Sequence, residues 1–333
     1  MTRAILSLLL FTGSAMAVTW STDDHRQVLE LHGKIEQNLG ALGYQPGYRA
    51  ESFGGDTHAS VGLSGAGRLN SDVILIGELS WDLVNDSRYG DHIYSDEAWL
   101  GVRIRDDLEL TVGRSDSPFN QLRDKTDVFN LFGGNAYAYL VDGTLDDQLK
   151  VTWAGDGWDL RAGYAANDAN RQDDNEDTKV RYGGSVGYQA QNGLGAVVAY
   201  DNKREGSPHS DVSNMAVGLS YQSPGGFYAA VTRGRTDFQH NWQVYSLKDQ
   251  RFYNMRRVDY WESVLSYSRE NMAFGVGYSR QSLREAAHLH WVDEYILATE
   301  YYLMPKAKVY AELLLNRMDG QDNLYGVGLQ YYF

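Results

Sequence analysis

The chain has 333 residues, with 44 Asp and Glu against 30 Lys and Arg, a formal net charge of −14 and no cysteine. The acidic balance argues against a nucleic-acid-binding protein, and the lack of cysteine excludes disulfide frameworks and thiolate metal sites. The mean hydropathy of −0.47 excludes a bundle of membrane helices. It does not exclude a membrane β-barrel, because the polar residues that face a barrel's interior lower the average.

Residues 1–17 are predicted to be a secretory signal peptide. Arg3 gives the positive start, Ala4–Phe11 is a short apolar run, and Ala15-Met16-Ala17 is a small-x-small cleavage site. The apolar run is far below the ~20 residues that span a bilayer, so a retained anchor is the weaker alternative. The mature chain, 18–333, is then a single domain, and the loss of Arg3 makes its formal charge −15.

Apolar and polar residues alternate with period two along the mature chain, which predicts β-strands. In the first segment one face carries Leu29, Leu31, Gly33 and Ile35, and the other carries Glu30, His32, Lys34 and Glu36. Burying the charged face in a packed core would cost several kcal/mol for each unpaired charge, whereas a water-filled barrel solvates it. We count sixteen such segments, with the phase least defined in Glu97–Arg103 and Gly195–Tyr200. Other clear segments are 59–64, 75–82, 108–112, 148–153, 159–164, 274–278 and 308–313.

The connections between segments alternate in length. Seven short turns separate eight longer polar stretches, and this arrangement fits sixteen strands with both chain ends on the short-turn side. Outer-membrane barrels have this organisation, with long loops on the extracellular side. The longer stretches are 38–57, 84–95, 115–147, 165–180, 202–213, 233–258, 280–293 and 316–322. A soluble propeller or β-helix would show a repeated motif, which the sequence lacks. The pattern therefore predicts an all-β, 16-stranded antiparallel transmembrane barrel.

Aromatic residues gather near the ends of the predicted strands. Amphipathic rings favour the two membrane–water interfaces, so we expect these residues to form the aromatic belts of a barrel. They are Trp81, Trp99, Trp153, Trp158, Tyr188, Tyr221, Tyr267, Tyr278 and Tyr301.

The last segment places Tyr325, Val327, Leu329, Tyr331 and Phe333 on one face and ends in an aromatic residue. It resembles the closing strand of Gram-negative outer-membrane porins. In that family the barrel-assembly machinery reads the terminal Phe strand, so the resemblance implies this role for Phe333.

Further motifs resemble the general trimeric porins in their order and spacing. They are Leu31-His32-Gly33-Lys34, Val112-Gly113-Arg114 followed by Pro118-Phe119, the Thr-Asp and Phe-Gly-Gly of Thr126–Gly134, and Val309-Tyr310-Ala311-Glu312. The resemblance covers essentially the whole mature chain. It implies a sixteen-stranded barrel that forms a homotrimer, with loop 3 folded into the lumen as an eyelet.

In the family, acidic residues of loop 3 face basic residues of the barrel wall across the eyelet. The resemblance assigns these roles to Asp127 in the loop and Lys34 on the first strand. Other family positions differ: Leu131 replaces a loop glutamate, Ser60 stands at a wall arginine, and Asp96 or Glu97 stands at the next one.

A further wall arginine would fall within 145–148, where the chain has none. The eyelet candidates are therefore completed by Arg123 and Asp124, next to the loop motif, and by Arg103 and Arg161 on the wall, with Lys125 as an alternative. An ordinary capping role for Asp127 and an inward charge away from the narrowest point for Lys34 remain the alternatives.

The sequence thus predicts an outer-membrane porin for passive diffusion of ions and small hydrophilic solutes, with a mild cation preference that follows from its acidic loops. No P-loop, zinc-protease or nucleophile-elbow motif is present, so we expect no enzyme, catalytic residue, metal or cofactor. The expected partners are further copies of the chain, outer-membrane lipid and lipopolysaccharide. The alternative is a substrate-selective porin, for example for an oligosaccharide, with Tyr137 and Tyr139 as stacking residues. A barrel enzyme and an adhesin role of the loops are the remaining hypotheses.

Overall fold

The computed structural model describes residues 18–24, 26–42, 53–86, 90–137, 140–166, 178–205, 211–246, 251–286, 290–318 and 320–333. The predicted leader, 1–17, lies outside these ranges. No helix within them is long and apolar enough to cross a bilayer.

The described chain consists mainly of strands. They are β1 (Val18–Ser21), β2 (Gln27–Ala41), β3 (Gly54–Arg68), β4 (Val73–Asp86), β5 (Gly90–Ile104), β6 (Leu108–Asp116), β7 (Thr144–Gly155), β8 (Trp158–Ala166), β9 (Thr178–Gln189), β10 (Leu194–Glu205), β11 (Asp211–Gln222), β12 (Phe227–Ser246), β13 (Arg251–Arg269), β14 (Met272–Leu283), β15 (His290–Met304), β16 (Ala307–Asn316) and β17 (Leu324–Tyr332). Three short helical turns accompany them: α1 (Asn120–Arg123), η1 (Asn135–Tyr137) and η2 (Arg284–Ala286).

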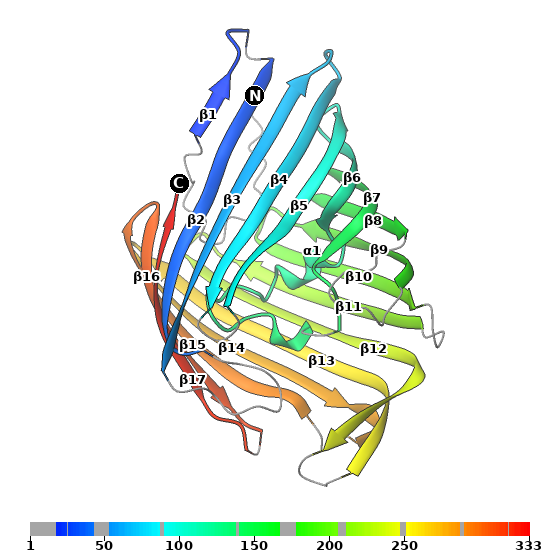
Figure 1. The fold of residues 1–333 in the computed structure, drawn as a ribbon, viewed down its shortest axis with the longest axis vertical. Helices are drawn as coiled ribbons and strands as arrows, with labels where there is room; N and C mark the ends of the chain where they lie inside the picture. The colour runs from blue at the N-terminus through cyan, green and yellow to red at the C-terminus, as the bar shows by residue number, and fades with distance from the viewer. Residues whose placement is uncertain are drawn as a thin grey trace.

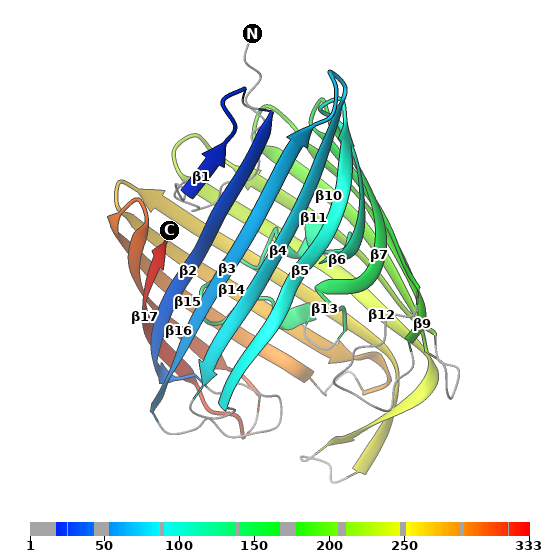
Figure 2. The ribbon, with the colours of Figure 1, turned by 45° about the horizontal axis from the view of Figure 1, so that its top comes forward.

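Strands β2 to β17 form a closed ring in which each strand pairs antiparallel with its neighbours in sequence. β17 closes the ring by pairing with β2, from Tyr325 opposite Ala41 to Tyr332 opposite Lys34. Both ribbon views show the tilted strands surrounding one enclosed space (Figures 1 and 2). The predicted all-β, sixteen-stranded antiparallel barrel is confirmed.

The two faces of the barrel wall have opposite chemistry. In β11, Met215, Val217 and Leu219 are 50%, 47% and 60% exposed, whereas Asn214 and Ser220 on the other face are buried. Successive side chains of a strand point to opposite faces, so the contrast repeats along the barrel. We call the two sides the hydrophobic face and the polar face. An exposed hydrophobic face is what a barrel presents to lipid.

β1 and β17 share one edge of β2. β17 pairs with Lys34–Ala41, and β1 continues along the same edge with Val18 opposite Leu31. Between them, Phe333 donates its N–H to the Gly33 carbonyl at 3.0 Å and accepts the Gly33 N–H at 3.3 Å. The C-terminus lies beside β1 in both views (Figures 1 and 2). β17, Phe333 and β1 therefore follow one another along the same edge of β2. We call this junction the seam.

Two of the predicted long loops, 84–95 and 233–258, are mostly strand in the structure. In the first, β4 runs to Asp86 and β5 begins at Gly90. The stretch 233–258 was expected to be a long polar loop, but β12 runs to Ser246 and β13 begins at Arg251. After a register shift between Asp237 and Trp242, the two strands continue to pair as far as Ser246 opposite Arg251. Backbone hydrogen bonds sustain this hairpin without a continuous hydrophobic face, so period-two patterning does not reveal it.

A β-bulge decides the orientation of Glu97–Arg103. The pairing of β4 with β5 shifts register between Leu79 and Trp81, which moves the following side chains of β5 to the opposite face. Leu100 is 67% exposed on the hydrophobic face. Trp99 therefore lies on the polar face, where its indole N–H donates to Glu97 Oε2 at 2.8 Å. It does not belong to the aromatic belt to which the sequence assigned it.

Replacing Gly33 with alanine is expected to weaken the seam by ~1–3 kcal/mol, as overpacking of a close contact does. A Cβ at Gly33 would lie 2.2 Å from the Ser60 carbonyl oxygen and 2.6 Å from the ring of Phe333. The matched control is Gly67→Ala on β3, because a Cβ there meets nothing within 4 Å. Heat unfolding in detergent, followed by gel mobility, should show a lower transition temperature for Gly33→Ala alone. Equal temperatures for the two variants would contradict this reading.

Candidate pore constriction

Residues 117–143 connect β6 to β7, and we call them the β6–β7 segment. Its two ends are held together, because Ser117 donates its backbone N–H to the Gly143 carbonyl at 2.8 Å and the Asn120 amide donates to the same carbonyl at 2.8 Å. Ser117 also accepts the Phe119 N–H on its hydroxyl at 3.2 Å. Pro118 precedes α1, where its fixed φ suits the start of a helical turn. The segment therefore leaves the wall and returns to it at one place.

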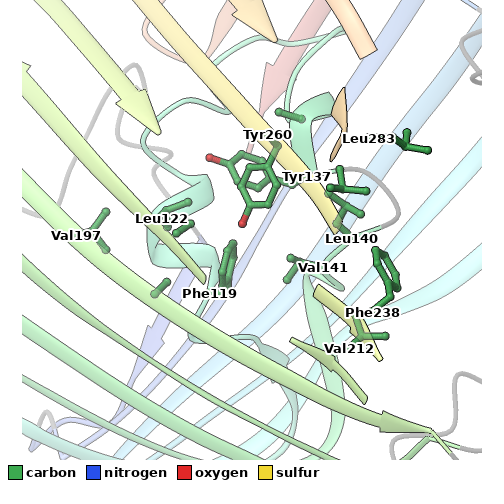
Figure 3. Close-up of a cluster of buried hydrophobic side chains, with 14 residues drawn as sticks. Phe119, Leu122, Tyr137, Leu140, Val141, Val197, Val212, Phe238, Tyr260 and Leu283 are labelled. Carbon is green, nitrogen blue, oxygen red and sulfur yellow. The ribbon is translucent and has the colours of Figure 1, made fainter. Parts of the chain in front are cut away.

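An apolar cluster packs the segment against the barrel wall. The rings of Phe119 and Tyr137 meet edge-on with centroids 6.2 Å apart, and Tyr137 meets Tyr260 of β13 at 5.2 Å. Figure 3 shows these rings together, with Leu122 of α1 and Val197 of β10 in the same cluster. Val197 and Tyr260 lie on the polar face, so apolar side chains replace polar ones where the segment covers that face.

Buried carboxylates of the polar face hold the early and late parts of the segment. Glu262 of β13 accepts the Thr126 hydroxyl at 2.6 Å and the Ser279 hydroxyl of β14 at 2.8 Å. Glu294 of β15 accepts the Asn135 amide at 2.6 Å. Buried carboxylates need hydrogen-bond donors in place of water, and the segment supplies several of them.

Glu312 of β16 holds the middle of the segment. Its two carboxylate oxygens accept the backbone N–H groups of Asn130, Leu131 and Phe132 at 2.6, 3.0 and 3.1 Å. The Asn130 side chain also donates to Glu300 of β15 at 2.6 Å. Three successive amides directed at one carboxylate fix the path of the backbone at this point.

Two glycines allow Asp127 to lie close to the chain that follows it. A Cβ at Gly133 would lie 2.4 Å from Asp127 Oδ1, and Gly134 has a φ of +66° and would place a Cβ 2.9 Å from Oδ2. The Asp127 carboxylate is 3.9 Å from Arg123 Nη2, and both side chains are partly exposed. The structure thus brings together the predicted residues Asp127 and Arg123.

Asp124 immediately follows α1 and its side chain is solvent-exposed. Protein packed around the carboxyl removes part of its hydration and raises its pKa to about 6. The negative charge of Asp116 adds to this increase in pKa, and Arg161 opposes it. Asp124 therefore lies in the electrostatic field of two wall residues, one of which, Arg161, the sequence predicted for the eyelet.

The predicted basic residues of the wall each have a carboxylate neighbour. Lys34 Nζ lies 3.1 Å from Glu36 Oε2. Arg161 binds Asp159 with two hydrogen bonds, at 3.1 and 2.7 Å. In this way the positive charge of each residue is largely balanced on the same strand.

Arg103 is the next-to-last residue of β5, which ends at Ile104 before the short turn to β6. Its Nε donates to Glu109 Oε1 at 2.7 Å across that turn. The structure therefore places Arg103 at the short-turn end of the barrel, away from the other predicted residues on the β6–β7 segment.

Three acidic residues that were not predicted for the eyelet, Asp82, Asp96 and Asp116, interact electrostatically with predicted eyelet residues or with each other. Asp116, at the end of β6, interacts electrostatically with Asp124 and with Asp96 of β5. Asp96 also interacts electrostatically with Asp82 of β4, and Asp82 interacts electrostatically with Lys34. We call Asp82, Asp96, Asp116 and Asp124 the acidic row. It leads from the barrel wall to the β6–β7 segment.

Part of the acidic row had a signal in the sequence. Asp82 belongs to an alternating segment, and Ser60, which stands at a family arginine, pairs in register with both Lys34 and Asp82. Asp96 had a partial signal, because it or Glu97 stands at a family arginine, but it lies at the bulge where the alternation loses its phase.

A sequence profile of the family described as Gram-negative porin matches residues 4–331. The chain belongs to the Gram-negative porin family. Gram-negative porins are barrels of the outer membrane, so the chain is assigned to that membrane. Porins of this family are channels and not enzymes, and no catalytic chemistry is assigned to the barrel. Comparison with curated proteins gives no match.

Solved porins share the fold at low sequence identity. Salmonella typhi OmpF in complex with daunomycin is 17% identical, covers 94% of this chain and 100% of its own, and has a TM-score of 0.80. An anion-selective porin from Comamonas acidovorans is 14% identical over 92% of this chain and 100% of its own, with a TM-score of 0.70. The trimer form of Vibrio cholerae OmpT is 18% identical over 92% and 99%, with a TM-score of 0.66.

Replacing Glu312 with alanine is expected to release the middle of the β6–β7 segment. The change removes the acceptor of three backbone N–H groups, and leaving such groups unsatisfied costs about 1–3 kcal/mol each where they stay buried. Chymotrypsin should therefore cleave near Phe129–Phe132 in the folded variant. The control is Glu109→Ala, whose carboxylate binds Arg103 at the short-turn end. Equal resistance of both variants to cleavage would show that Glu312 does not hold the segment.

Proposed function

We propose that this porin is a water-filled channel for ions and small hydrophilic solutes, that the β6–β7 segment lies in its lumen, and that the channel prefers cations. The acidic row is the observation that carries the preference. The position of the segment is supported by its bonds to Glu262, Glu294 and Glu312 on β13, β15 and β16, far around the ring from β6 and β7. The enclosed space is the direct route between these parts of the wall.

The preference for cations follows from how the charges are distributed. Lys34 and Arg161 each lie beside a carboxylate, so they add little net positive potential. The four carboxylates of the acidic row, together with that of Asp127, add negative charge near Lys34 and Arg161. Low-dielectric walls focus such a field into the water between them and raise the local concentration of cations.

We further propose that Asp127, Asp124, Arg123, Lys34 and Arg161 line the narrowest part of the channel, together with the acidic row. Arg103 would line the short-turn mouth, because it is paired with Glu109 at that end. Its charge would then affect solutes after the constriction and not within it.

The assembly that we propose is a homotrimer, as the family resemblance implies. The trimer form of Vibrio cholerae OmpT supports it. Cleavage after Ala17 is compatible with the seam, because Val18 is the first residue that pairs with β2. Phe333 at that seam is the proposed signal for the barrel-assembly machinery.

An arginine row on the hydrophobic face supports a contact with lipopolysaccharide. Arg233 of β12 is opposite Trp261 of β13, and Trp261 is opposite Arg280 of β14. The rings of Tyr278 and Tyr295, tilted to each other with centroids 4.9 Å apart, lie next to this row. Arginine beyond an aromatic belt reaches the headgroup level, where guanidinium groups bind phosphate. We propose that this end of the barrel faces the outer leaflet.

The alternative is an oligosaccharide-selective porin with Tyr137 and Tyr139 as stacking residues, and the position of Tyr137 argues against it. Tyr137 is 1% exposed and is held between Phe119 and Tyr260, so its ring is not offered to a passing sugar. Tyr139 lies outside the described residues. Saturable block of the current by sugars at micromolar concentration would favour this alternative.

A KCl gradient across a planar bilayer is expected to give a reversal potential that favours K⁺ over Cl⁻ by ~2-fold or more. Replacing both Asp82 and Asp96 with lysine should abolish or reverse the preference. The control replaces Asp23 and Asp106, exposed residues outside the acidic row, with lysine and changes the net charge by the same amount. A wild-type preference for Cl⁻, or equal shifts in both double variants, would overturn the assignment.

The cation preference is also expected to fall as the pH is lowered from about 7.5 to about 5, where carboxyls of ordinary pKa remain ionised. The pKa of Asp124 is raised to about 6, so this carboxyl is charged at the higher pH and mostly neutral at the lower one. Reversal potentials at both pH values measure the change. Asp124→Asn should reduce the pH dependence, and a variant that keeps all of it would refute the role of Asp124.

A further inference from the structure

We propose that Arg181 is a positioning residue that clamps the returning end of the β6–β7 segment and so sets the width of the channel. The inference rests on the proposed function, because it assumes that the segment narrows a conducting lumen. It concerns a residue of the barrel wall that was not predicted to belong to the eyelet.

Arg181 of β9 is buried, with a side-chain exposure of 1%, and its guanidinium binds two carboxylates. Nε and Nη2 donate to the two oxygens of Asp201 of β10 at 2.9 and 3.0 Å. Nη1 donates to Asp142 of the segment. Asp201 is 2% exposed, whereas Asp142 is 48% exposed. The guanidinium thus joins a fixed wall carboxylate to a carboxylate of the segment.

The same site also holds the backbone of the segment. Asp201, Asn214 and Thr236 lie in register across β10, β11 and β12. The Asn214 amide donates to the Leu140 carbonyl at 3.2 Å, and the Thr236 hydroxyl donates to the Asn214 side-chain oxygen. The clamp therefore contacts the segment at two points, the carbonyl of Leu140 and the carboxylate of Asp142.

The chemistry of arginine makes this contact persistent. A guanidinium stays charged at any physiological pH, and its planar fork fits two carboxylates at once. If Asp142 moved away, a buried positive charge would lose one of its acceptors, which strongly disfavours the displaced position. Glu262, Glu294 and Glu312 hold residues 126–135, and Ser117 and Asn120 hold Gly143. The clamp adds the polar contacts at Leu140 and Asp142, between these two held parts.

The test is Asp142→Ala in the full-length trimer, reconstituted in planar bilayers. Single-channel conductance is measured with neutral polyethylene glycols of increasing size on both sides, and the smallest polymer that no longer enters is recorded. Neutral polymers report the width of the channel and not its charge. We expect the conductance to rise about 1.3-fold or more, and the excluded size to increase, because pore diameter controls both.

The matched control is Asp147→Asn, an exposed acidic residue in the adjoining strand whose positive φ of 50° asparagine tolerates. It should leave the conductance and the excluded size unchanged. Wild-type values in Asp142→Ala, in a barrel with normal heat-modifiable mobility, would overturn the positioning role. A wild-type protein that does not conduct would instead refute the proposed function, so the two failures are distinguishable.

Arg181→Lys gives a graded test. Lysine keeps the positive charge but cannot bind both carboxylates with a planar fork. We expect its excluded polymer size to lie between those of the wild type and Asp142→Ala. If Arg181→Lys fails to fold, the Asp142→Ala result still decides, because that change leaves the buried pair of Arg181 and Asp201 intact.

Discussion

Closure of the hydrogen-bonded ring is the constraint on which the rest of this molecule depends. In hydrocarbon an open sheet edge would leave unpaired N–H and C=O groups, each costing several kcal/mol, so a barrel must pair its last strand with its first. Here the edge of β2 is covered by β17, by the two hydrogen bonds between Phe333 and Gly33, and then by β1. Once the ring is closed, one face of each strand must meet lipid and the other is freed for polar chemistry.

The polar face also holds the long β6–β7 segment against the barrel wall. Carboxylates buried in a protein need donors, and backbone amides of an irregular segment need acceptors. Glu262, Glu294 and Glu312 meet both needs at once, so wall and segment satisfy each other. The apolar cluster around Phe119 and Tyr137 adds burial to these bonds. Arg181 supplies the complementary charge at the point where the segment returns to β7.

The electrostatics of the channel follow from which charges are paired. Salt bridges on one strand, such as Lys34 with Glu36, cancel over a short distance. The acidic row is different, because its members repel one another and are drawn from β4, β5, β6 and the segment. Like charges held together by a rigid wall produce a field that reaches into the water. The proposed preference for cations rests on this arrangement and not on the overall charge of the chain.

The sequence by itself determined the strands, their faces and the closing segment, because a period of two along a strand is a local property. The Phe-Gly-Gly motif was visible in the sequence, but only the structure shows that a Cβ at Gly133 or Gly134 would meet the Asp127 carboxylate. The sequence could not fix the face of Glu97–Arg103, where a bulge depends on the partner strand, or the extent of β12 and β13, where backbone pairing continues without a pattern. Only the tertiary structure brought Thr126 to Glu262, Asp142 to Arg181, and Asp124 to Asp116. These contacts depend on the register and tilt of all the strands in the ring. The sequence around either of the two contacting residues does not encode them.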